Sequence, residues 1–92
     1  MQFKVVRICE SDALSVIPKE SVRFDIDRSA EILEMEGYEV DNAGVMLIAK
    51  KEGMEITVYR NGRLMIHPIE DRERAAEIAE AFYSTIEEGR ED

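Results

Sequence analysis

The chain has 92 residues, a length that suits one domain with a single modest core. It carries 21 acidic and 12 basic residues, so the formal net charge is −9, and such a surface repels phosphate backbones and disfavours a nucleic-acid partner. The longest unbroken apolar run, residues 45–49, is too short for a transmembrane helix.

The first expected strand covers residues 3–9, FKVVRIC, because this run is rich in β-branched and aromatic residues. Its Cys9 is the single cysteine, so the chain forms no internal disulfide, and we expect a small buried apolar side chain in a reducing compartment. The N-terminus lacks a signal-peptide pattern, and we expect a cytoplasmic location. Residues 10–24 have no clear period and contain Pro18, so we expect an irregular connection.

A helix is predicted from DIDRSAEILEMEG. Apolar residues recur in it at helical spacing, Asp25 or Asp27 can cap the first amides, and Gly37 stands where a helix ends.

Short strands and turns follow this helix. Residues 38–41 form either a strand or a loop, and residues 45–50 and 54–60 have the length and composition of strands. Asn61-Gly62 is the strongest hairpin signal in the chain and predicts a two-residue type I′ turn, after which residues 63–67 return.

The last predicted helix runs from Asp71, its N-cap, to about Glu88. One apolar stripe marks it, formed by Ala75, Ile78, Ala79, Phe82 and Ile86. Residues 89–92 are expected to be a frayed tail.

These elements predict a single α+β domain over residues 1–92. We expect an antiparallel sheet of four to five strands with two helices on one face, in the order β-α-β-β-β-β-α.

The predicted two-residue turn determines which hairpin side chains share a face. It pairs Tyr59 with Leu64 and Thr57 with Ile66. The face with Met54, Ile56, Val58, Met65 and His67 is assigned to the helices because it is more continuously apolar. An interaction face is then predicted at Thr57, Tyr59, Leu64 and Ile66.

The segment GVMLIAKKEGMEITVYRNGRLMIHPIEDRERAAEIAEAFY resembles the later part of one half-repeat of the TATA-binding protein fold. That half-repeat consists of a strand, a helix, antiparallel strands and a long C-terminal helix, and the resemblance covers most of the chain, with residues 10–24 as an insertion. It implies that helices cover the convex face and leave the concave face for binding. The family inserts phenylalanines into the DNA minor groove from that face, and the wedge position falls on Tyr59. This chain has one half-repeat where the family has two, a tyrosine at the wedge position and a net charge of −9. What the resemblance implies for this chain is therefore an interaction module.

Residues 25–36, DIDRSAEILEME, have the acidic spacing of a calcium loop, with Asp25, Asp27 and Ser29 at positions one, three and five. Ala30 replaces the glycine at position six, and the segment also has helical periodicity, so an acidic helix start is the alternative interpretation. A looser Ca²⁺ site would use clustered surface carboxylates. The candidates are Asp25, Asp27, Glu31, Asp41, Glu70 and Asp71.

Catalytic patterns are weak. His67 is the single histidine, so neither a zinc site nor a nucleophilic triad is indicated, and the glycines are scattered at turns. The sequence therefore predicts a small non-catalytic interaction module without a cofactor, whose partner is another protein or a second copy. The alternative function is divalent-cation binding by the carboxylates.

Overall fold

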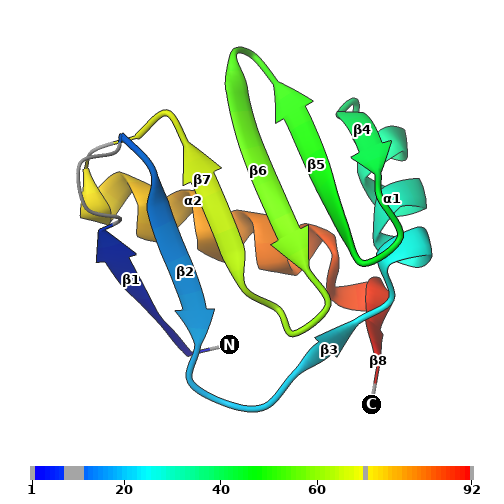
Figure 1. Cartoon of the computed structure of the whole chain (residues 1–92), viewed down its shortest axis with the longest axis horizontal. Helices are drawn as coiled ribbons and strands as arrows, with labels where there is room; N and C mark the ends of the chain where they lie inside the picture. The colour runs from blue at the N-terminus through cyan, green and yellow to red at the C-terminus, as the bar shows by residue number, and fades with distance from the viewer. Residues whose placement is uncertain (1, 8–11, 70, 92) are drawn as a thin grey trace.

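The computed structural model describes residues 2–7, 12–69 and 71–91, and Figure 1 shows its elements in chain order. They are β1 (Phe3–Arg7), β2 (Leu14–Pro18), β3 (Arg23–Phe24), α1 (Ile26–Met35), β4 (Glu39–Asn42), β5 (Met46–Lys51), β6 (Met54–Tyr59), β7 (Leu64–His67), α2 (Arg72–Thr85), the 3₁₀ helix η1 (Glu87–Gly89) and β8 (Arg90–Glu91). None of the described helices has the length and apolar character needed to cross a membrane. The predictions for Cys9 and Glu70 fall outside the described residues.

The main sheet has six antiparallel strands in the order β1-β2-β7-β6-β5-β4. The predicted α+β class with an antiparallel sheet and two helices is confirmed, and the sheet has more strands than the four to five expected. The additional strand is β2, which lies inside the segment predicted to be an irregular connection. It pairs on both edges, with β1 and with β7.

Both helices begin where the sequence predicts. Asp25 accepts a hydrogen bond from the Arg28 amide, and Asp71 accepts from the amides of Glu73 and Arg74, so each helix has an aspartate N-cap. Gly37 has φ +92° just after α1, in the left-handed region that ends helices.

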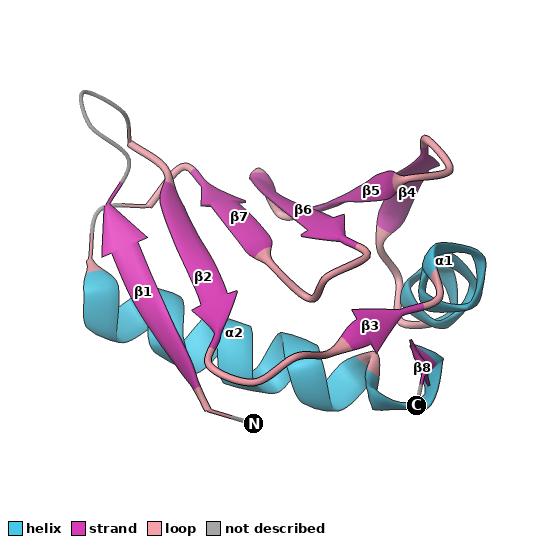
Figure 2. Cartoon of the chain, turned by 60° about the horizontal axis from the view of Figure 1, so that its bottom comes forward, coloured by secondary structure: helices cyan, strands magenta, loops and turns pink. Residues whose placement is uncertain are grey.

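The helices cover one face of the sheet, and Figure 2 shows them on the same side. α1 lies against β4 and β5, and α2 lies against β1 and β2. Their buried side chains share one cluster with the alternate strand residues that point to the same side. The buried members of this cluster that come from the six-stranded sheet are Leu14, Val16, Leu47, Ala49, Ile56, Val58, Leu64 and Ile66.

The β6–β7 turn differs from the predicted one. The Tyr59 amide donates to the Arg63 carbonyl and the Gly62 amide donates to the Tyr59 carbonyl, both at 3.0 Å, which encloses a three-residue loop. Gly62 has φ +86°, whereas Asn61 is not in the left-handed region, so this is a type I turn followed by a left-handed glycine and not a type I′ turn. The added loop residue shifts β7 by one position relative to the prediction.

The predicted frayed tail is also wrong for the described residues 89–91. β8 pairs with β3 in a two-stranded sheet, and the Asp25 amide donates to the Gly89 carbonyl at 2.7 Å. Gly89 is buried against Ser29, and an added Cβ on Gly89 would come within 2.6 Å of the Ser29 Oγ. The tail was predicted to fray because it has no apolar side chain, but backbone pairing holds it.

Candidate functional site: the open face of the sheet

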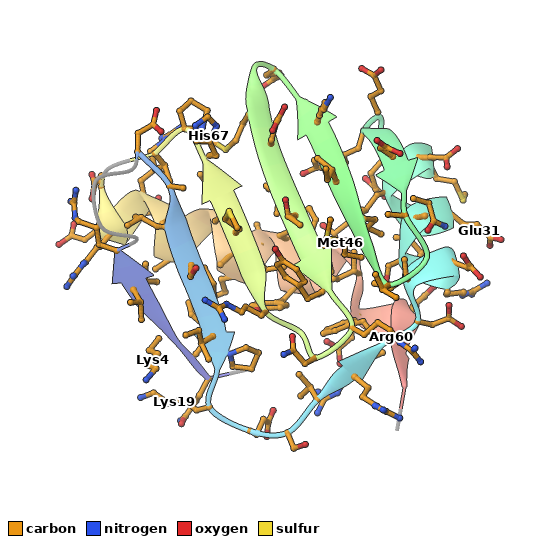
Figure 3. The ribbon with its side chains drawn as sticks, viewed as in Figure 1. Lys4, Lys19, Glu31, Met46, Arg60 and His67 are labelled. Atoms are coloured by element: carbon orange, nitrogen blue, oxygen red, sulfur yellow. The ribbon has the colours of Figure 1, made fainter. Side chains whose placement is uncertain are left out.

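The face of the six-stranded sheet opposite the helices is uncovered, and Figures 1 and 3 look onto it. We call it the open face. Paired residues of antiparallel strands point to the same side, so the register defines three rows across it. The middle row is Val6, Ser15, Met65, Thr57, Ile48 and Asp41. The lower row is Lys4, Ile17, Arg63, Tyr59 and Met46. The upper row is His67, Glu55, Lys50 and Glu39.

The structure corrects half of the predicted interaction face. Thr57 and Tyr59 lie on the open face, as predicted, but Leu64 and Ile66 are fully buried on the helix side. The three-residue loop is the cause, because a shift of one residue moves every side chain of a strand to the opposite face. Ile66 consequently pairs with Ile56 and not with Thr57.

The centre of the open face is apolar and only partly exposed. Its half-buried residues are Ile17, Met46, Ile48, Thr57, Tyr59 and Met65. Val6 at the β1 edge is 39% exposed. Sequence reasoning missed Ile17 because β2 was not predicted, and Met65 because the register of β7 was wrong. It missed Met46 and Ile48 because no face was assigned to the predicted strand at residues 45–50.

Ser15 is buried in the middle of this face. It is 2% exposed although no helix covers it, and the Arg63 guanidinium contributes to its cover, with Nη2 at 3.4 Å from the Ser15 Oγ. The Arg63 side chain therefore lies along the open face.

Charges on the open face are separated. Lys4 and Arg63 are the charged residues of the lower row, and Figure 3 shows Lys4 near Lys19 at the lower end of β1 and β2. The opposite edge, β4, presents Glu39 and Asp41, both exposed. The face is thus positive at β1 and negative at β4.

The upper row contains two charge-assisted contacts. His67 Nε2 lies 2.8 Å from Asp12 Oδ1, and both side chains are about half exposed. Lys50 Nζ lies 3.8 Å from Glu55 Oε1, which makes a weak surface ion pair. Neither contact places a Ser, Thr or Cys side chain beside His67. These two contacts therefore do not form a nucleophile–base pair.

The described carboxylates proposed for Ca²⁺ are not gathered into one site. Asp25 and Asp71 cap different helices, and Asp27 Oδ1 accepts a hydrogen bond from Asn42 Nδ2 at 2.8 Å. Over residues 2–7, 12–69 and 71–91, no group of three or more His, Cys, Asp or Glu side chains is placed to hold a metal. Ser29, position five of the loop pattern, is buried in α1 against Gly89. The geometry of these residues therefore lends no support to the calcium hypothesis.

A separate cavity of about 250 Å³ lies on the helix side of the sheet. Lys51 lines this cavity, with Nζ 4.9 Å from the Tyr38 ring centroid and 3.1 Å from the Glu36 carbonyl oxygen. Burial, followed by the charges of Glu36 and Glu52, raises the pKa of Tyr38. Because Lys51 already has partners, this cavity is a weaker candidate site than the open face.

Comparisons of the chain with protein-family models, with curated proteins and with solved structures found no significant match.

Proposed function

We propose that this protein is a non-catalytic interaction module whose open face binds another protein surface. The observation that carries the proposal is an uncovered sheet face with an apolar centre. Sheets are most stable when each apolar face is packed, and a contiguous exposed apolar patch on a small domain marks a contact surface.

The element order supports the same conclusion. With β1, the two-residue strand β3 and the segment after α2 set aside, the order β2, α1, β4 to β7, α2 agrees with the strand–helix–strands–helix order that the sequence resemblance implies. We propose on this basis that the fold is related to a single TATA-binding protein half-repeat. Because the chain has a net charge of −9, which repels phosphate backbones, we infer that its partner is a protein and not DNA.

Site-specific photo-crosslinking tests the proposal. A benzoylphenylalanine in place of Tyr59 should form a specific protein adduct in cells or in concentrated protein. The matched control places the same group at Met35, which is 88% exposed on α1, away from the open face. We expect the adduct from position 59 alone, and its loss when Ile48→Thr and Met65→Thr reduce the apolar area. If position 59 gives no more adduct than position 35, the open face is not a contact surface.

A further inference from the structure

We propose that the surface bound by the open face is the open face of a second copy of this chain, in a two-fold symmetric, face-to-face dimer. This inference rests on the proposed function and names its partner. In the dimer, strand β1 of each copy lies over strand β4 of the other.

The distribution of charge selects a second copy. The chain carries −9, so two copies repel over most of their surfaces. The open face is the exception, because among the described residues of its three rows three Lys and Arg side chains balance three carboxylates. These are Lys4, Lys50 and Arg63 against Glu39, Asp41 and Glu55. The rest of the molecule therefore carries the whole net charge, and this face allows two copies to approach.

The arrangement of those charges selects the symmetry. A two-fold interface brings a surface patch against itself, so residue i meets residue j of the partner, and j meets i. We place the two-fold axis in the plane of the interface, roughly parallel to the strands. The positive β1 edge of each copy then meets the negative β4 edge of the other, which gives two equivalent contacts. Packed sheets keep their strands within about 30° of one another. A rotation of that size is sufficient to bring Lys4 within reach of the Asp41 of the other copy.

The apolar centre meets its own copy near the axis. Met65 lies on β7, and Thr57 and Tyr59 lie on β6, so the two-fold rotation places β7 of each copy over β6 of the other and brings these side chains together. Six strands of four to six residues form this face, so it measures about 25 by 20 Å. The dimer interface is therefore smaller than the roughly 800 Å² per partner of a standard interface.

Charge reversal at the two edges tests the geometry. Lys4→Glu should place two carboxylates together at both symmetric contacts, and Asp41→Lys should place two ammonium groups together. Each variant should weaken the dimer about tenfold or more in sedimentation equilibrium at low ionic strength. An equimolar mixture should dimerise again, because one contact is then reversed and the other is native. The double variant Lys4→Glu/Asp41→Lys should also dimerise.

Two matched variants control for net charge. Glu31→Lys changes the charge as Asp41→Lys does, but Figure 3 shows Glu31 on α1, away from the open face. Arg72→Glu on α2 matches Lys4→Glu in the same way. Both should dimerise within about threefold of the parent, and circular dichroism should show all the variants folded.

The outcomes separate this inference from the proposed function. A parent that stays monomeric up to millimolar concentration, or a mixture that does not recover, overturns the face-to-face dimer. If the parent is monomeric while position 59 still forms an adduct with a different protein, the interaction module stands and the self-partner does not. If position 59 forms no adduct and the parent is monomeric, both fail.

Discussion

At the scale of single residues, Gly62 connects the β6–β7 turn to the rest of the core. The Tyr83 hydroxyl donates a hydrogen bond to the Gly62 carbonyl, and the Tyr83 ring stacks on Phe24 at 6.1 Å. A Cβ on Gly62 would lie 2.4 Å from Val22 Cγ2 and 3.1 Å from Pro18 Cγ. The turn is therefore packed from both sides, and its geometry determines the register of β7.

Gly62→Ala should destabilise the fold by about 2–5 kcal/mol, because it adds the strain of positive φ to overpacking against Val22. Gly53→Ala is the control, since Gly53 has φ +83° and no atom within 4 Å of the added Cβ. It should lose about 1–2 kcal/mol from the backbone strain alone. Chemical denaturation measures both, and equal losses would show that the contacts around Gly62 do not constrain it.

Tyr83 gives the fold a dependence on alkaline pH. The side chain is 3% exposed, and burial raises its pKa above the usual 10.0. Above pH 10 the unfolded chain releases this proton while the folded chain retains it, so the free energy of unfolding falls as pH rises.

Tyr83→Phe should cost about 1–3 kcal/mol at neutral pH, because the Gly62 carbonyl loses its donor. The substitution should also make the free energy of unfolding fall less steeply above pH 10, by up to about 1.4 kcal/mol per pH unit. Denaturation midpoints between pH 9 and 11.5 measure the change, with Tyr38→Phe as the half-buried comparison. An unchanged slope would mean that Tyr83 ionises equally in both states.

At the scale of elements, the Leu64 and Met65 side chains distinguish the observed register of β7 from the predicted one. Leu64→Ala should cost about 2–5 kcal/mol because Leu64 is fully buried. Met65→Ala, on the half-exposed open face, should cost about 1 kcal/mol or less in dilute monomer. The reverse order of losses in urea denaturation would restore the two-residue turn and the faces that follow from it.

Elements with local signals were predictable from the sequence. The helices carry their caps and apolar stripes within about a dozen residues, so their positions were predicted closely. β2 was missed because Leu14–Pro18 lacks a clear alternating pattern and contains Pro18, and one of its two partners is distant. β8 was missed because its partner is distant. Leu14–Val16 pairs with residues 64–66, and Arg90 pairs with Phe24.

The candidate site was half predictable for the same reason. Asn61-Gly62 predicted a hairpin correctly, but the choice between a two- and a three-residue loop depends on packing around Gly62. That choice moved Leu64 and Ile66 into the core and placed Met65 on the open face. Alternation alone could not reveal it, because both faces of β7 carry apolar side chains.

At the scale of the whole molecule, the charge of −9 and the sequence pI of about 4.6 act on stability as well as on partners. Self-repulsion opposes the compact state, and salt screens it. We expect the free energy of unfolding to rise as KCl increases from about 0.01 to 0.3 M, measured at a fixed, dilute protein concentration. A decrease would show that surface pairs such as Lys50–Glu55 outweigh the net repulsion.

The pairing of β3 with β8 also has a consequence for how the chain folds during synthesis. Residues 23–25 pair with residues 89–91, across α1, four strands and α2. A nascent chain therefore cannot close this contact until residue 91 has left the ribosome, and the helix that covers β1 and β2 emerges only shortly before. Domains generally fold as units. We therefore expect this one to remain a ribosome-tethered, incomplete fold until translation has passed its last strand, and then to fold in one step.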